Sequence, residues 1–219
     1  MAGLALSWSG GKDSALALWM LRREQREPAV LLTTVTETYE RVSMHGVRRA
    51  LLVRQAEQLA IPLVEITIPS GCSNELYEQR VEEAFGTAAL AGIDTVAYGD
   101  LFLEDVRAYR EKQLAAIGRQ GSFPIWGLDT SDLARTFVDG GFEATLVCVD
   151  PRKLDRRFAG RAFDRGLLND LPANVDPCGE NGEFHTFVDA GPIFAGPIAC
   201  SRGEVVERDF FVFCDLLPD

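Results

Sequence analysis

The chain has 219 residues, of which 47% are hydrophobic, so it can bury the core of one large domain or of two smaller ones. Its formal net charge of -11 argues against general nucleic-acid binding, because contact with a phosphate backbone needs clustered lysine and arginine. No apolar run reaches the roughly 20 residues of a membrane span, and the first residues lack the pattern of a signal peptide, so we expect a cytoplasmic protein.

The cysteines and histidines do not form a metal-binding pattern. The chain has five cysteines without a C-x-x-C pair and only two histidines, which disfavours a structural zinc site. An odd, unpatterned set of cysteines is typical of reduced thiols in a cytosol-like compartment.

The first half of the chain alternates strand-like and helix-like segments. Apolar, β-branched runs predict strands, and apolar residues at helical spacing predict helices. The predicted strands are 4–8, 29–37, 63–69, 95–101 and 123–128, and the predicted helices are 14–24, 45–61, 74–92 and 104–118. This alternation predicts an α/β fold, in which helices sandwich a five-stranded parallel sheet.

The pattern changes after Gly127. We expect a short helix over 129–141, a strand over 143–151 and, because residues 172–197 are dense in Gly, Pro, Asn and Asp, a structured loop there. The C-terminal stretch predicts a hairpin that turns at Arg202-Gly203. The sequence therefore predicts two domains, 1–127 and 128–219, of which the second is a smaller α+β region.

One motif lies at the junction of the first predicted strand and helix. The segment S-G-G-K-D-S comprises Ser9, Gly10, Gly11, Lys12, Asp13 and Ser14. A helix N-terminus offers unpaired N–H groups and a partial positive charge, and glycines allow an anion to approach the backbone closely. A tight turn with a helix cap is the plainer interpretation, but it needs neither a lysine nor two hydroxyls. The motif therefore predicts a phosphate site.

The spacing of the motif distinguishes among phosphate loops. It fits neither the Walker pattern G-x-x-x-x-G-K-[ST] nor the dinucleotide pattern G-x-G-x-x-G. It resembles instead the PP-loop of ATP pyrophosphatases, which cleave ATP between the α and β phosphates. That resemblance implies an adenine nucleotide alpha hydrolase-like fold, with ATP and Mg²⁺ as cofactors and Asp13 as a candidate metal ligand.

Further segments extend the resemblance over residues 4–197. They are RVSMHG (41–46), YGDLFLEDVRAYRE (98–111), FPIWGLDT (123–130), LVCVDPRKL (146–154) and LPANVDPCGENGEFHTFV (171–188). Together they resemble the ATP-binding diphthine–ammonia ligase family. The resemblance implies that domain 1–127 binds nucleotide and domain 128–219 binds substrate. It also implies an AMP-forming carboxylate–ammonia ligase that uses ATP and ammonium, with diphthine on elongation factor 2 as acceptor if the source is archaeal or eukaryotic.

The segment CGENGEFHT provides the candidate catalytic residues beside Lys12. Glu180 and Glu183 are candidates to hold ammonium and take its proton, since the glycines next to them allow a sharp turn. His185 is a candidate base or orienting group, and Asn181 a candidate substrate contact. A glycine-rich turn with solvated glutamates is the alternative. We expect Cys178, in the same segment, to be an inert thiol.

The segment after the fourth predicted strand adds candidate ligands. Gly99 and Asp100 end that strand where the nucleotide cleft is expected, so we assign them to nucleotide binding. Glu104, Arg107 and Arg110 are assigned to substrate, because arginine can bind phosphate or carboxylate through two bonds. The alternative is a surface ladder of ion pairs at helical spacing. His45, after the second predicted strand, is a further candidate nucleotide contact.

The sequence leaves several interpretations open. A related enzyme that acts on another small-molecule carboxylate, or an ATP-binding regulator without turnover, would carry the same phosphate loop. A tRNA-modifying enzyme of the PP-loop type is disfavoured, because paired cysteines and a basic surface are absent from the sequence. The acceptor is left open, as is the choice between a monomer and a homodimer.

Overall fold

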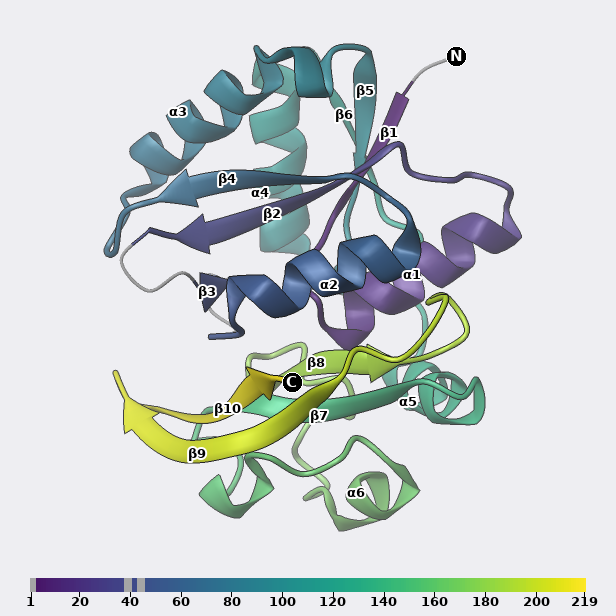
Figure 1. Ribbon diagram of the computed structural model, residues 1–219, viewed down its shortest axis with the longest axis vertical. Helices are drawn as coiled ribbons and strands as arrows, with labels where there is room; N and C mark the ends of the chain where they lie inside the picture. The colour runs from purple at the N-terminus through teal and green to yellow at the C-terminus, as the bar shows by residue number, and fades with distance from the viewer. Residues whose placement is uncertain (1–2, 38–40, 43–45) are drawn as a thin grey trace.

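The computed structural model describes residues 3–37, 41–42 and 46–219, and in these residues five parallel strands form one sheet (Figure 1). The strands, in spatial order, are β4 (Leu63–Ile68), β2 (Val30–Thr36), β1 (Gly3–Ser7), β5 (Ile93–Ala97) and β6 (Gln120–Ser122). A short strand, β3 (Arg41–Val42), pairs antiparallel with the end of β2. Strand order reverses between β1 and β5, and in open α/β sheets this point forms the ligand crevice.

Helices cover both faces of the parallel sheet. Helices α1 (Lys12–Arg23) and α2 (Arg49–Leu59) pack on one face, while α3 (Asn74–Phe85), a short 3₁₀ turn (Ala88–Leu90) and α4 (Glu104–Ala116) pack on the other (Figure 1). The alternation of side chains along β1 explains this arrangement, because Ala5 lies in the core under α3 and α4 whereas Leu6 lies in the core under α1 and α2. The predicted α/β sandwich is therefore confirmed.

The C-terminal region adds a second sheet. It has the order β8-β7-β10-β9 and is antiparallel throughout (Figure 1). Its strands are β7 (Glu143–Val149), β8 (Phe184–Ala190), β9 (Cys200–Arg208) and β10 (Phe211–Pro218), and its helices are α5 (Thr130–Asp139), α6 (Arg165–Asp170) and a 3₁₀ turn (Arg156–Phe158). Phe137 and Phe187 share one buried cluster with Leu16 of α1, so this region packs on the α1–α2 layer. The domain boundary at residue 127 stays a prediction.

Several predicted elements end elsewhere in the structure. The strand predicted over 123–128 is wrong: β6 precedes it, Pro124 has no N–H for a ladder, and Phe123 and Trp126 pack around Arg107 instead. The helix predicted over 74–92 stops at Phe85. The helix predicted from residue 45 begins at Arg49 within the described residues.

The region predicted as a loop over 172–197 contains the strand β8, so that prediction is wrong in part. Consecutive residues of β8, from Phe184 to Val188, pair with β7, which lies about 40 residues earlier in the chain. The hairpin is present, but its turn is wrong: Arg202 and Gly203 lie within β9, and the chain reverses at Asp209 and Phe210, which have φ of 49° and 69°. Among the described residues, no helix combines the length and apolar composition needed to cross a membrane.

Candidate active site

The segment that we call the phosphate loop, residues 8–14, joins β1 to α1 at the crevice. Gly10 has a φ of 77°, a left-handed conformation that favours glycine, and Gly11 is the N-cap of α1 without a side-chain cap bond. The Gly11 N–H donates to Ser9 Oγ at 3.2 Å, and Ser14 Oγ donates to the Gly11 carbonyl at 2.9 Å. The structure thus brings the predicted glycines and hydroxyls together at the start of a helix.

Lys12 is buried at the base of this loop. Its side chain is 3% exposed, and its Nζ lies 2.8 and 2.9 Å from the carboxylate oxygens of Asp13. Burial, the largest single influence, lowers the pKa of Lys12, but the charge and hydrogen bonds of Asp13 together with other nearby groups, Glu180 among them, raise that pKa above its ordinary value. The Nζ also lies 5.6 Å from the ring centroid of Phe184 on β8. Lys12 is therefore a fixed, fully charged ammonium.

The end of β5 lies against the first turn of α1. A Cβ on Gly99 would come within 2.7 Å of the Asp13 carbonyl carbon and oxygen, so this approach requires glycine. The neighbouring Asp100 accepts from Arg110 Nε at 2.6 Å and from Arg110 Nη2 at 3.2 Å. The predicted residues Gly99, Asp100 and Arg110 therefore lie together beside the phosphate loop.

Glu180 reaches the end of β5 from the C-terminal region, on the other side of the crevice. Its Oε1 accepts from the Leu101 N–H at 2.8 Å. Burial raises the pKa of Glu180; the Leu101 N–H opposes this shift, while the nearby carboxylates of Asp13 and Asp100 reinforce it, and the pKa is about 7. Glu180 is thus a carboxyl group that can exchange a proton near neutral pH.

The segment that we call the glutamate loop, residues 176–183, is organised by Asp176. Its Oδ1 accepts from the Cys178 and Glu180 N–H groups at 2.9 and 3.1 Å, and its Oδ2 accepts from Thr130 Oγ1 at 2.7 Å. Cys178 is buried, and burial raises its pKa to about 12, so the thiol stays protonated, as expected for an inert thiol. Asp176 therefore fixes the backbone at Glu180 and, with it, the direction of the Glu180 side chain.

Glu183 is buried in the glutamate loop, whereas its neighbour Asn181 is exposed. Glu183 is 3% exposed, and its Oε1 accepts from the Asp176 N–H at 3.1 Å and from Asn181 Nδ2 at 3.3 Å. Lys153 Nζ donates to the Asn181 carbonyl. These contacts hold the loop in shape, and none of them joins Glu183 or Asn181 to the phosphate loop.

His185, Glu104 and Arg107 are also not brought to the phosphate loop. Thr186 accepts the Lys12 N–H at 3.0 Å, and strand alternation places His185 on the opposite face of β8. Arg107 pairs with Glu111 at 2.9 Å and stacks over the rings of Phe123 and Trp126, which matches the ion-pair alternative. Glu104 is exposed at the first residue of α4. His45 lies outside the described residues.

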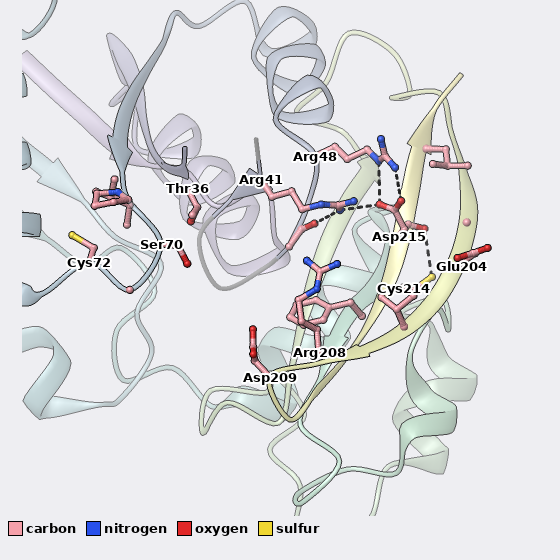
Figure 2. A pocket seen from close by; sticks show the side chains of 18 residues that line it. Thr36, Arg41, Arg48, Ser70, Cys72, Glu204, Arg208, Asp209, Cys214 and Asp215 are labelled. Carbon is pink, nitrogen blue, oxygen red and sulfur yellow. Dashed lines mark hydrogen bonds and ion pairs between the residues drawn. The ribbon is translucent and has the colours of Figure 1, made fainter. Parts of the chain in front are cut away.

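A cavity of about 920 Å³ opens at the same edge of the parallel sheet, beyond the ends of β2 and β4 and under the β9–β10 hairpin (Figure 2). One wall is an ion-pair cluster that we call the arginine clasp. Arg41 donates to Asp215 at 2.9 Å, and Arg48 donates to the same carboxylate at 2.6 and 3.1 Å (Figure 2). The clasp ties β3 and the start of α2 to the C-terminal strand.

The described residues contain no group of three or more His, Cys, Asp or Glu side chains placed to hold a metal ion. Mg²⁺ in nucleotide sites is usually held by one or two carboxylates and by substrate phosphates, so such a group is not required. Asp13, whose side chain is 31% exposed, contacts Lys12 through both carboxylate oxygens and lies near Glu180 and Asp100, so it is the candidate carboxylate for that role.

Sequence reasoning missed the residues that support the loops. Thr186 binds the first N–H of α1, Gln55 binds the Gly10 carbonyl, Asp176 shapes the glutamate loop and Asp215 forms the clasp. Gln55 did leave a signal: it is a polar residue on the apolar face of α2, four residues from both Leu51 and Leu59. Thr186 and Asp215 depend on contacts between distant segments, whereas Asp176 acts within its own loop.

The chain is similar to known protein families and to known proteins. Residues 2–120 match the diphthamide synthase N-terminal domain family, and residues 129–215 match the diphthamide synthase C-terminal domain family. The chain is 27% identical to a diphthine–ammonia ligase of Schizosaccharomyces pombe, over 95% of this chain and 38% of that protein. It is 26% identical to a protein of Xylella fastidiosa named 4-hydroxy-tetrahydrodipicolinate synthase, over 86% of this chain and 59% of that one. The chain thus spans between about two fifths and three fifths of the length of these relatives.

Proposed function

The chain belongs to the diphthamide synthase family, and from that premise we propose that it is an ATP-dependent carboxylate–ammonia ligase that releases AMP and pyrophosphate. The observation that carries the proposal is the convergence of the phosphate loop, buried Lys12 and Glu180 at one crevice. A phosphate grip and a carboxyl group with a pKa of about 7 are the two parts that adenylation followed by amidation needs.

In the first step, a carboxylate oxygen of the acceptor attacks the α phosphorus of ATP. The bond from that phosphorus to the bridging oxygen breaks, and pyrophosphate leaves with the electron pair. The loop N–H groups and the Lys12 ammonium face the charge that builds on the leaving group, which lowers the barrier most where water is excluded. Mg²⁺, held by Asp13 and the phosphates, would supply further positive charge.

In the second step, ammonia forms a bond to the acyl carbon, the bond from that carbon to the AMP oxygen breaks, AMP leaves with the electron pair, and the new amide nitrogen loses one proton to solvent. Ammonium must first lose a proton, and Glu180 is the group placed to accept it, because its pKa of about 7 lies between that of an ordinary glutamate and that of ammonium. Four carboxylates, those of Asp13, Asp100, Asp176 and Glu180, lie near one another, against two cationic side chains: Lys12 beside Asp13, and Arg110 beside Asp100. Such a site attracts small cations, which suits ammonium and Mg²⁺.

We propose diphthine on elongation factor 2 as the acceptor where the source organism makes it, and another carboxylate where it does not. The name of the ligase from Schizosaccharomyces pombe supports the first choice. The name of the Xylella fastidiosa protein describes a different activity, so the acceptor needs a direct test.

The decisive experiment is an assay of the nucleotide product. The full chain is incubated with ATP, Mg²⁺, ammonium and either diphthine-bearing elongation factor 2 or a panel of small carboxylates. We expect continued release of AMP and pyrophosphate only with both ammonium and an accepted carboxylate, whereas the carboxylate without ammonium should release at most about one pyrophosphate per protein chain. ADP as the only product, or ATP binding without any turnover, would refute the proposal and favour the regulator. Glu183→Ala should retain ATP binding; if it retains amide formation as well, Glu183 has no catalytic role.

A further inference from the structure

We infer that Gln55 is a positioning residue of the phosphate loop: it fixes the direction of the Gly10–Gly11 peptide, so that the loop offers N–H groups and not a carbonyl oxygen to pyrophosphate. The inference rests on the proposed function in one respect, namely that this loop receives pyrophosphate. Gln55 lies on α2, outside the motif, and is fully buried.

The side-chain amide of Gln55 is bound on every side. Its Oε1 accepts from Trp8 Nε1 at 2.8 Å, and its Nε2 donates to the carbonyls of Gly10 at 3.1 Å and Val188 at 2.6 Å. Both amide hydrogens therefore have acceptors. Because Trp8 directly follows β1 and Val188 lies on β8, one side chain connects the phosphate loop to both sheets.

The carbonyl of Gly10 is held from two directions. It accepts from Gln55 Nε2 and also from the Val188 N–H at 2.9 Å, which uses both of its lone pairs. In a planar trans peptide the C=O and N–H point in opposite directions, so the Gly11 N–H is directed away from Gln55, to the side of Ser9 Oγ. A rotated peptide would present a carbonyl oxygen to an anion and repel it.

The fit between Gln55 and Gly10 is close. A Cβ on Gly10 would lie 2.8 Å from Gln55 Oε1, so the loop passes directly over this side chain. A methionine in place of Gln55 would keep the length of the side chain but lose both donors. A glutamate would keep the acceptor for Trp8 and, when ionised, set a carboxylate against two carbonyl oxygens.

The first test compares Gln55→Met with Gln113→Met by calorimetric titration with inorganic pyrophosphate and Mg²⁺. Gln113 is the matched control: it is a buried glutamine on α4, and within the described part of the chain its Nε2 has no hydrogen-bond partner. We expect pyrophosphate affinity to fall about tenfold or more in Gln55→Met and to stay at the wild-type value in Gln113→Met. Equal affinities in both variants would overturn the inference, whatever their melting temperatures.

The second test uses pH and does not depend on whether Gln55→Met folds. In the Gln55→Glu variant, the new carboxyl group can donate to one carbonyl while it is protonated, whereas its ionised form cannot. The ratio of the pyrophosphate affinity of Gln55→Glu to that of the wild type should therefore fall as pH rises from about 5.5 to about 9. A constant ratio would overturn the inference. If the wild type itself binds no pyrophosphate, the proposed function fails and this inference with it; a wild type that binds, alongside variants that bind equally well, refutes the inference alone.

Discussion

The phosphate loop and the glutamate loop are both rich in glycine, and both place side chains at the crevice. Different contacts stabilise the two loops. The phosphate loop directly connects β1 to α1, and these two elements fix the positions of its ends. The glutamate loop follows α6 after a five-residue connection and leads directly into β8, and its bend is shaped by one carboxylate, Asp176, which binds two N–H groups of the same loop. The shape of a loop that joins a strand directly to a helix can be predicted from sequence patterns. The shape of a loop that folds around one of its own side chains is much harder to predict.

The comparison also separates the two glutamates that the sequence presents as equivalent. Glu180 reaches across to the Leu101 N–H beside the phosphate loop, whereas Glu183 turns inward to the Asp176 N–H. Their spacing of three residues, with a glycine before each, gives no basis for that choice. The geometry therefore favours Glu180 for the proposed proton-accepting role; the Oε1 of Glu183 is bound within the loop, and its Oε2 is buried without a hydrogen-bond partner among the described residues.

The largest effect that we expect is from Lys12→Ala, which removes the buried positive charge at the base of the phosphate loop. The carboxylates of Asp13 and Glu180 would then face the ATP phosphates without compensation. We expect AMP formation to fall by about a thousandfold, since the loss of one stabilising donor alone costs about a hundred- to a thousandfold. Lys112→Ala, at an exposed residue of α4, is the control and should stay within about threefold of wild type in the same assay. Similar losses in both variants would show that general charge, and not the loop, determines the rate.

The next effect concerns the pH dependence of the reaction. Burial, reinforced by Asp13 and Asp100, gives Glu180 a pKa of about 7, and only its ionised form can take a proton from ammonium. The rate of amide formation should therefore rise with pH through about 7, and Glu180→Gln should lower it by about a hundredfold at about pH 8. The comparison with Glu183→Gln is decisive: that variant should keep the wild-type pH profile. A profile altered by Glu183→Gln and not by Glu180→Gln would reverse the assignment.

The sequence predicted the first sheet and the phosphate loop because both are local. Apolar strands and amphipathic helices are legible as patterns, and S-G-G-K-D-S carries its own conformational preferences. It did not predict β8, because FHTFVDA becomes a strand only by pairing with β7. It misplaced the hairpin turn because Arg202-Gly203 looks like a turn, whereas Asp209 and Phe210 adopt left-handed conformations there. The contacts of Thr186, Gln55 and Asp215 join segments far apart in the chain. A single sequence does not indicate which distant segments come into contact.

A third prediction concerns stability and the fit of the phosphate loop. Gly10→Ala must accommodate a left-handed φ of 77° and a Cβ 2.8 Å from Gln55 Oε1, which together should cost about 3 kcal/mol. Gly118→Ala is the matched control, since Gly118 has a φ of 69° but no atom within 4 Å of the added Cβ. It should cost about 1 kcal/mol. Urea unfolding measures the free energy of unfolding of both variants. Equal losses would mean that a Cβ at Gly10 does not clash with Gln55.

The smallest effect should come from the arginine clasp, which joins the two sheets beside the cavity. Burial alone would raise the pKa of Asp215, but the hydrogen bonds from Arg48 and Arg41 outweigh it and lower that pKa to about 2. A lowered pKa stabilises the folded chain at pH values above the ordinary aspartate value, and this contribution is lost as pH falls toward about 2. Asp215→Asn should therefore cost about 1–2 kcal/mol in urea unfolding at about pH 7, after allowance for partial exposure, and the cost should shrink as pH falls from about 5 to about 3.

Glu65→Gln is the matched control for the clasp, because Glu65 pairs with Arg49 at 2.7 Å and its side chain is 19% exposed, against 18% for Asp215. That pair joins α2 to β4 of the parallel sheet and does not connect the two sheets. Its loss should therefore cost less than about 1 kcal/mol. If the two variants unfold alike at about pH 7, the clasp is an ordinary surface pair and contributes nothing specific to the junction of the sheets.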